Sequence, residues 1–123
     1  MDDLIRGRIR EFLMEFKEIV VHRGLDVIPR RENIDALAEL GLTRKNRVDE
    51  ILALSVDDYC SGPEPDNDRP GDLWIFGKQV GSVSIYIKLK IAQIGEEKIA
   101  KCLSFHAAKF PLCFPCREKE RGE

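Results

Sequence analysis

The sequence lacks any apolar run approaching the ~18–20 residues that a membrane-spanning helix needs. Residues 1–6 also lack the basic and then apolar layout of a secretory signal. Without such a signal, the 4 cysteines indicate reduced thiols rather than a disulfide framework. We therefore expect a cytoplasmic protein that has no membrane partner.

Extreme composition is absent as well. Hydrophobic residues make up 43% of the chain and charged residues 34%, which is typical of a globular protein and argues against a disordered or fibrous one. At 123 residues, one domain that spans residues 1–123 is the default expectation. The net charge of −2 is unevenly distributed along the chain: the middle segment, residues 31–72, is acidic, with five basic and eleven acidic side chains. Residues 73–95 carry no acidic side chain, so a basic face for a polyanion remains possible.

The first half of the chain has helical periodicity. Apolar residues recur at spacings of three and four over Leu4–Val21, which predicts an amphipathic helix. Residues 25–28 are a short strand candidate. Asn33 is a suitable N-cap for a second helix, Thr43 opens a third, and residues 55–58 have the form of a capping box.

The second half changes to the period of a β-strand. Residues 73–78 resemble a strand, and 84–91 alternate without error, with Tyr86, Lys88 and Lys90 on the polar side. In a third strand, residues 99–106, we expect Leu103 and Phe105 to face the core, and Cys102, Ser104 and His106 to face away from it. Pairing of the last two strands would place Ile91 near Ile99, with Tyr86 and His106 at opposite ends.

Together these segments predict an α+β fold in which N-terminal helices pack on one face of a small twisted antiparallel sheet. The other face of that sheet should be partly open to solvent. The predicted organisation has four parts: mainly helical residues 1–60, a Pro/Gly loop at 61–72, an antiparallel sheet at 73–110 and a flexible tail at 111–123.

The open face collects side chains that suit RNA cleavage without a metal or other cofactor. A base removes the 2′-hydroxyl proton, an acid protonates the leaving oxygen, and cations hold the phosphate. Imidazole titrates near neutral pH and serves as acid or base, while a phenol stacks on a base or donates its proton. The candidates are Tyr86, Lys88 and His106 for catalysis and Lys78, Lys90 and Ser104 for RNA contact. The alternative is that these residues merely form the solvated face of a sheet.

The cysteines leave three interpretations open. Cys113 and Cys116 form a CxxC motif, but only seven residues follow it, which leaves no room for the helix that a thioredoxin-like site requires. A zinc site would need Cys60 and Cys102 as further ligands, at a spacing typical of no common zinc motif. Otherwise these are plain thiols, and we predict no metal in the functional site.

Several segments of the chain resemble the MqsR family of bacterial toxins. They are residues 42–43, 51–59, 71–78, 86–90 and 103–106, within a likeness that covers about residues 20 to 110. The resemblance implies the toxin component of a type II toxin–antitoxin system, with a fold similar to RelE and YoeB. It also implies an endoribonuclease that cleaves mRNA without a metal, and a cognate antitoxin as partner.

The family's site residues carry over in part. Its sheet tyrosine falls on Tyr86 and its strand lysine on Lys88, while His106 stands where the family has lysine. A family lysine falls on Cys60 or Ser61, and a family glutamine falls on Ile75, so these two side chains are missing. Two other classes stay open: a non-catalytic module that binds protein or RNA with the same face, and a zinc-stabilised structural domain.

Overall fold

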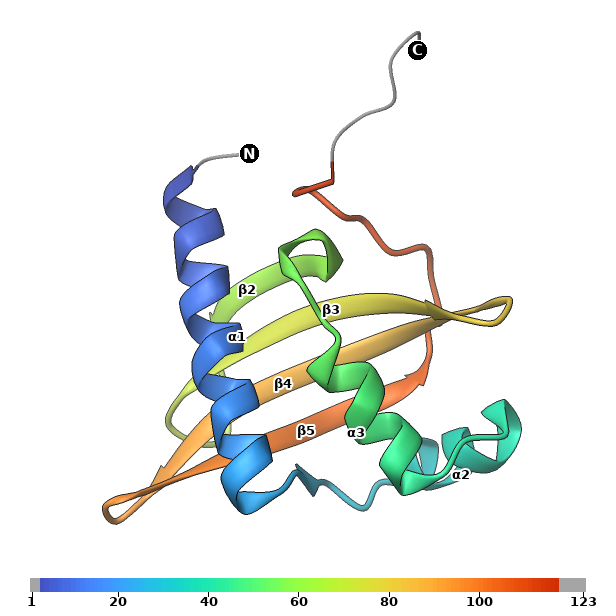
Figure 1. Ribbon diagram of the computed structural model, residues 1–123, viewed down its shortest axis with the longest axis horizontal. Helices are drawn as coiled ribbons and strands as arrows, with labels where there is room; N and C mark the ends of the chain where they lie inside the picture. The colour runs from blue at the N-terminus through green and yellow to red at the C-terminus, as the bar shows by residue number, and fades with distance from the viewer. Residues whose placement is uncertain (1–2, 118–123) are drawn as a thin grey trace, which may run out of the picture.

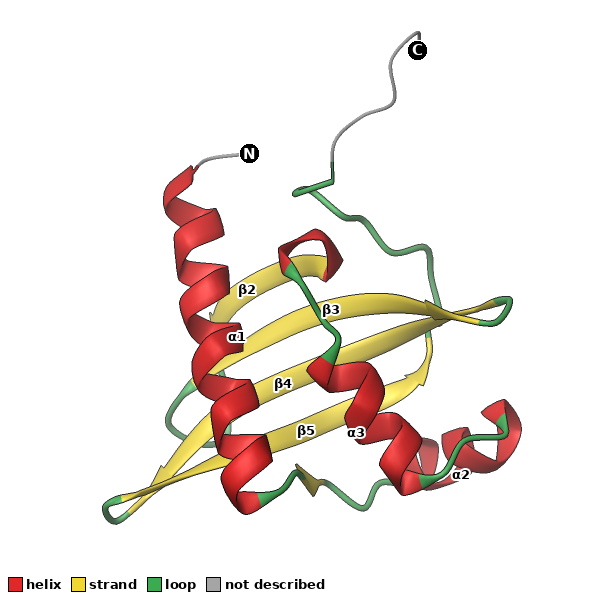
Figure 2. Cartoon of the chain, in the orientation of Figure 1, coloured by secondary structure: helices red, strands yellow, loops and turns green. Residues whose placement is uncertain are grey.

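The fold is α+β, as the sequence predicts. A computed structural model describes residues 3–117, with helices in the first half of the chain and most of the strands in the second (Figures 1 and 2). In chain order the elements are α1 (Asp3–Arg23), β1 (Asp26–Val27), α2 (Arg31–Leu40), α3 (Arg44–Leu52), the 3-10 helix η1 (Val56–Asp58), β2 (Tyr59–Pro65), β3 (Asp72–Val80), β4 (Val83–Ile94) and β5 (Glu97–Ala107). No helix within 3–117 is both long and apolar enough to cross a membrane.

The sheet is mixed rather than wholly antiparallel. Its strand order is β1-β5-β4-β3-β2, and β2 to β5 pair antiparallel. The two-residue β1 pairs parallel with β5, Asp26 opposite Lys101 and Val27 opposite Cys102. The prediction of a purely antiparallel sheet is therefore wrong, because β1 reaches the sheet from α1 rather than through a hairpin turn.

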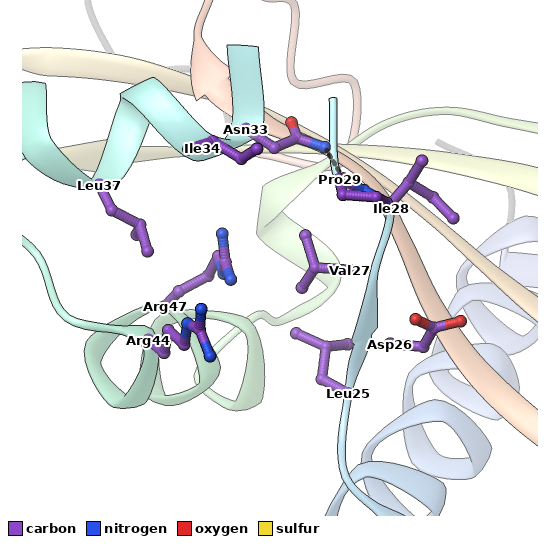
Figure 3. A pocket seen from close by; sticks show the side chains of 10 residues that line it. All are labelled: Leu25, Asp26, Val27, Ile28, Pro29, Asn33, Ile34, Leu37, Arg44 and Arg47. Atoms are coloured by element: carbon purple, nitrogen blue, oxygen red, sulfur yellow. Dashed lines mark hydrogen bonds between the residues drawn. The ribbon is translucent and has the colours of Figure 1, made fainter. Parts of the chain in front are cut away.

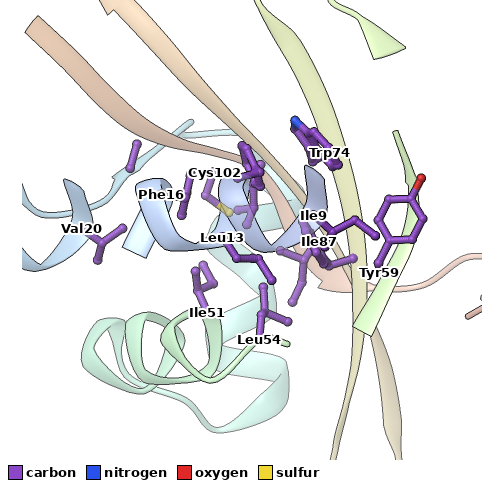
Figure 4. Close-up of a cluster of buried hydrophobic side chains, with 14 of the residues drawn as sticks. Ile9, Leu13, Phe16, Val20, Ile51, Leu54, Tyr59, Trp74, Ile87 and Cys102 are labelled. Carbon is purple, nitrogen blue, oxygen red and sulfur yellow. The ribbon is translucent and has the colours of Figure 1, made fainter. Parts of the chain in front are cut away.

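The core lies between α1, α3 and one face of the sheet. Figure 1 shows α1 and α3 over the same face, and Figure 4 shows their apolar side chains meeting those of the strands. The predicted amphipathic stripe of α1 is confirmed by the buried Ile9, Phe12, Leu13, Phe16 and Val20. The predicted alternation of β4 is confirmed by Ile85, Ile87 and Leu89, which are fully buried.

The predicted loop at 61–72 is wrong over its first five residues and at its last residue, Asp72, which begins β3. Tyr59–Pro65 forms β2, which pairs with β3 in an irregular register that places Glu64 opposite Leu73. A proline cannot donate to a strand ladder, and it is tolerated here because β2 is the edge strand. Residues 66–71 remain a turn, closed by the backbone N–H of Asp66 donating to Gly71 O at 3.1 Å.

A register shift in β5 changes which side chains face the core. The pairing moves from Leu89 opposite Cys102 to Lys88 opposite Ser104, so Leu103 is the extra residue of a β-bulge. Cys102 consequently faces the core and is fully buried, contrary to the predicted open-face position.

The predicted cap of the second helix is also wrong. The helix α2 begins at Arg31 with Arg30 as N-cap, so Asn33 lies inside the first turn. The Asn33 amide instead bonds three backbone groups: its Nδ2 donates to Ile28 O and Leu103 O at 2.9 Å each, and its Oδ1 accepts from Phe105 N–H at 3.0 Å. Asn33 thereby holds α2 beside the edge of β5, just beyond the end of β1. The predicted start of α3 is confirmed by the capping box between Thr43 and Asn46.

Residues of the predicted tail at 111–123 pack against the rest of the domain where the structure describes them, over 111–117. Cys116 is buried in the core cluster, and its carbonyl accepts a 2.7 Å hydrogen bond from Arg6 Nη2. A Cβ atom at Gly77 would lie 2.5 Å from the Leu112 side chain and 2.9 Å from the Phe114 ring, so this segment passes directly over β3 and a larger residue at Gly77 would displace these side chains. The rest of the predicted tail lies outside the described residues.

Candidate functional site

Tyr86 and His106 are direct cross-strand neighbours. The register of β4 and β5 places them opposite each other, and their ring centroids are 5.6 Å apart with 29° between the ring planes. The expectation that they sit at opposite ends of the hairpin is wrong. In an antiparallel hairpin, the residues of the two strands that are farthest from the turn pair with each other. Alternation from the buried Ile87 and Phe105 puts both rings on the face opposite α1 and α3.

Lys88 joins this pair on the same face. Its Nζ lies 5.8 Å from the centroid of the Tyr86 ring, within the range of a cation–π contact. No ion pair of Lys88 occurs within residues 3–117, which distinguishes it from the neighbouring Lys90. We call Tyr86, Lys88 and His106 the Tyr86 cluster. The structure thus brings together the three residues that the sequence predicts for catalysis.

The hydrogen bonds of His106 favour one tautomer. Its Nδ1 lies 3.0 Å from Ala107 O, and a carbonyl can only accept, so Nδ1 carries the proton of this contact. In the neutral ring, Nε2 is then the nitrogen free to take a proton. The Oε2 atom of Glu32 lies 3.7 Å from this Nε2.

Glu32 is also held in place by Lys109. Lys109 Nζ lies 2.6 Å from Glu32 Oε2. The hydrogen bond and charge of Lys109 lower the pKa of Glu32, and His106 lowers it further. Glu32 is therefore ionised at neutral pH beside His106. Sequence reasoning missed Glu32 because it lies on α2, and only the packing of α2 beside β5 brings it to the site.

Lys90 is on the open face but is not free to bind a phosphate. It is 3% exposed, and its Nζ lies 2.7 Å from Asp66 Oδ2 in the turn between β2 and β3. The hydrogen bond from Lys90 lowers the pKa of Asp66, and the Asp68 backbone N–H contributes to the same shift. The structure therefore gives Lys90 the role of anchoring this turn to the sheet.

The Lys90–Asp66 pair predicts a specific response to acid. Because folding lowers the pKa of Asp66, the ionised carboxylate stabilises the folded protein at pH values above 3.8, the ordinary pKa of the group. This stabilisation is lost as the pH falls through the lower pKa of Asp66 in the folded protein. We expect Asp66→Asn to be less stable than the wild type at pH 7, because Lys90 is then buried without a partner. We also expect the difference to shrink on acidification. Urea unfolding from neutral pH to about pH 3 measures it.

Asp49→Asn is the control for this experiment, because its salt bridge to Lys45 is largely exposed. Such pairs contribute little to stability, so Asp49→Asn should follow the wild type at every pH. An Asp66→Asn deficit that stays constant down to acid pH would contradict the assigned role of the Lys90–Asp66 pair.

Two other predicted RNA contacts are not available to a ligand on the open face. Lys78 pairs with the buried Ile85 and therefore points to the helical side, where its Nζ lies 3.2 Å from Glu50 Oε1. The prediction that it joins the open face is wrong, because residues 76 and 78 of β3 share the core side with Ile85. Ser104 lies opposite Lys88 but is only 5% exposed, so its hydroxyl is not accessible to a large ligand.

A groove of about 540 Å³ adjoins Lys88 at the end of the open face nearest the 66–71 turn. Five basic and three acidic residues line this groove. The basic residues are Arg30, Arg69, Lys88, Lys90 and Lys101, and the acidic residues are Glu64, Asp66 and Asp68. Sequence reasoning missed Arg30 and Lys101. The bulge at Leu103 reverses the alternation expected for Lys101, and Arg30 lies in the connection from β1 to α2.

The resemblance places a lysine at Cys60 or Ser61 and a glutamine at Ile75, and this chain has neither side chain. Ser61 and Ile75 lie in the same row of cross-strand neighbours as Lys88. Ser61 pairs with Ile75, Ile75 pairs with Lys88, and Lys88 pairs with Ser104 across β2 to β5. This row carries a hydroxyl and an apolar side chain beside Lys88 rather than further charges. Cys60, the other candidate position, is partly buried, and burial raises the pKa of its thiol to about 11.

The cysteines form no ligand cluster in the described part of the chain. All 4 are free thiols there, and no group of three or more His, Cys, Asp or Glu side chains is placed to hold a metal ion. Burial raises the pKa of Cys102 to about 12, which makes it an inert core thiol.

Comparison with known proteins adds no relative: no family model, curated protein or solved structure matches the chain.

Proposed function

We propose that this protein is a metal-independent endoribonuclease that cleaves mRNA, as the toxin component of a type II toxin–antitoxin system. On this proposal it is a cytoplasmic member of the MqsR family with a RelE-like fold. The observation that carries the proposal is the convergence of Tyr86, Lys88 and His106 on one sheet face, with 5.6 Å between the two rings and 5.8 Å from Lys88 Nζ to the Tyr86 ring.

His106 is assigned the proton transfer. With its Nδ1 proton directed to Ala107 O, Nε2 takes the 2′-hydroxyl proton, and the attacking oxygen then displaces the 5′-oxygen of the next nucleotide. The carboxylate of Glu32 lies 3.7 Å from the Nε2 atom that takes this proton. His106 then returns this proton to the leaving oxygen, or the Tyr86 phenol donates its own proton there and is reprotonated by His106.

Lys88 is assigned the phosphate. Charge builds up on the non-bridging oxygens as the 2′-oxygen attacks, and a fixed cation without a competing carboxylate stabilises that charge. Lys88 meets this requirement within the described residues, while Lys90 is neutralised by Asp66. The Tyr86 ring offers a stacking surface for a nucleobase, which is how proteins commonly hold single-stranded RNA.

The same face is the surface that a cognate antitoxin would cover on this proposal. A non-catalytic RNA-binding or protein-binding module is the rival, and the neutralised Lys90 together with the net charge of −2 favours it over a strongly basic nuclease. An assay of RNA cleavage distinguishes the ribonuclease from the binding module, whereas an assay of RNA binding does not.

The test incubates purified protein with an mRNA transcript in the presence of EDTA. We expect cleavage by the wild type and none by a variant that carries Tyr86→Ala, Lys88→Ala and His106→Ala together. Lys98→Ala is the matched control, because Lys98 is a β5 lysine paired to Glu15 of α1. RNA binding without cleavage, or cleavage only with added divalent metal, would contradict the proposal.

A further inference from the structure

A second cavity lies on the other side of β1, between β1, α2 and α3. Its volume is about 600 Å³, and Figure 3 shows the side chains that surround it. Its apolar lining is aliphatic and comes from the segment around β1 and from α2: Leu25, Val27, Ile28, Pro29, Ile34 and Leu37. The helix α3 contributes two arginines, Arg44 and Arg47, whose guanidinium groups extend into the space opposite Leu25 and Val27 in Figure 3.

Among the described residues, Arg47 is a buried cation without a partner. It is 8% exposed, and its Nε is buried with no hydrogen-bond acceptor in that part of the chain. No salt bridge of Arg47 is found between residues 3 and 117 either. Buried arginines are ordinarily paired, because removing a charge from water costs several kcal/mol that an opposite charge must offset.

The acid that lines this cavity does not neutralise the arginines. Asp26 extends from the opposite side of β1 in Figure 3, where its Oδ2 lies 3.2 Å from Lys101 Nζ. The amide of Asn33, the other polar lining group, is already used by three backbone hydrogen bonds. The cavity therefore presents two positive charges opposite aliphatic side chains, and no acidic side chain of residues 3–117 that lines it faces them.

The electrostatic surroundings of Arg47 favour the binding of an anion. Burial lowers the pKa of Arg47, the Cys102 thiol opposes this shift, and the neighbouring Arg44 adds to it. The volume also lies within the roughly 300–1,000 Å³ typical of small-molecule sites, which are mostly apolar with a few convergent polar groups. A planar guanidinium matches the two oxygens of a carboxylate or phosphate group.

We propose that this cavity binds a small organic anion: an oxyanion group held by Arg47 and Arg44, attached to a short aliphatic body that packs against Leu25, Val27 and Leu37. This site is separate from the Tyr86 cluster and does not depend on the ribonuclease proposal. The strand β1 divides the two, because Asp26 and Lys101 meet on the side of the groove while Val27 faces the cavity.

The test titrates the isotope-labelled full chain with hexanoate and follows the NMR signal of the Arg47 Nε–H group. Hexanamide has the same aliphatic body without the charge, and inorganic phosphate has the charge without the body. We expect hexanoate to shift this signal with a Kd at or below about 1 mM. Hexanamide and phosphate should each bind at least about tenfold more weakly, because each lacks one of the two contacts.

Variants then test whether Arg47 contacts the carboxylate of hexanoate. Arg47→Met keeps a long side chain and removes the charge, and we expect it to weaken hexanoate binding by at least about tenfold, measured calorimetrically. Lys45→Met is the matched control, because Lys45 is a largely exposed lysine of α3 with its own partner in Asp49. It should bind within about twofold of the wild type.

Three results would overturn the proposal. They are the absence of an Arg47 Nε–H shift with hexanoate, equal affinity for hexanoate and hexanamide, and equal affinity for hexanoate and phosphate. Because the wild-type titrations decide these outcomes, the test stands even where Arg47→Met fails to fold.

Discussion

Replacing His106 by alanine is expected to lower the rate of RNA cleavage by about 10²–10⁴-fold, the usual contribution of a positioned acid or base. The imidazole is the proton-transfer group of the Tyr86 cluster, and its orientation is set by Ala107 O at 3.0 Å and by Glu32 at 3.7 Å. The measurement is single-turnover cleavage of a labelled RNA in EDTA by wild-type and variant protein.

The chain supplies its own control for this prediction. It contains only two histidines, and His22 lies exposed in the last turn of α1, so His22→Ala should cleave at the wild-type rate. Urea unfolding of His106→Ala must show that the fold is retained. A folded His106→Ala variant that cleaves as fast as His22→Ala would remove His106 from the mechanism.

Tyr86→Phe separates the two roles open to the phenol. Phenylalanine keeps the ring that stacks 5.6 Å from His106 and removes only the hydroxyl. A large loss of cleavage would assign Tyr86 to proton transfer, while a rate near that of the wild type would assign it to stacking on a base.

Replacing Asn33 by alanine is expected to lower the free energy of unfolding by about 3 kcal/mol, since each buried polar group left without a partner costs ~1–3 kcal/mol. Asn33 is 1% exposed, and its amide bonds Ile28 O, Leu103 O and Phe105 N–H. These backbone groups lie where β1 has ended and the edge of β5 has no further strand partner. Urea unfolding at neutral pH measures the loss.

Asp35→Ala is the matched control, because Asp35 is an exposed residue of the same helix. It should change the free energy of unfolding by no more than about 0.5 kcal/mol, as is usual for surface substitutions. Equal stability of Asn33→Ala and the wild type would contradict the assigned role.

Because Leu103 and Phe105 flank Ser104 beside the Tyr86 cluster, we also expect the Asn33→Ala variant to cleave RNA more slowly.

Much of the candidate site could be predicted because a β-strand has a strict period of two. The buried Ile85, Ile87 and Leu89 require Tyr86 and Lys88 to face the other way, whatever the rest of the fold does. The same reasoning failed one strand later. The bulge at Leu103 shifts the alternation of β5, so Cys102 turns into the core and Lys101 turns to the groove.

The charges could not be assigned from the pattern alone. Lys88 and Lys90 are equivalent in sequence, each on the polar side of the same strand. Only the turn at 66–71 distinguishes them, because it brings Asp66 to Lys90 and leaves Lys88 without an ion-pair partner in the described chain. Glu32 and Arg47 are likewise ordinary helical residues until packing places one beside His106 and the other in a cavity.

The sequence alone therefore determined the local features: the amphipathic first helix, the capped third helix, the alternating fourth strand and the α+β class. These depend on side-chain period and on hydrogen bonds between residues three or four apart, which a single segment contains. The tertiary structure decided the parallel pairing of β1, the edge strand β2, the bulge in β5 and the partner of each charge. Those features depend on contacts between distant segments, whose free energy no single segment specifies.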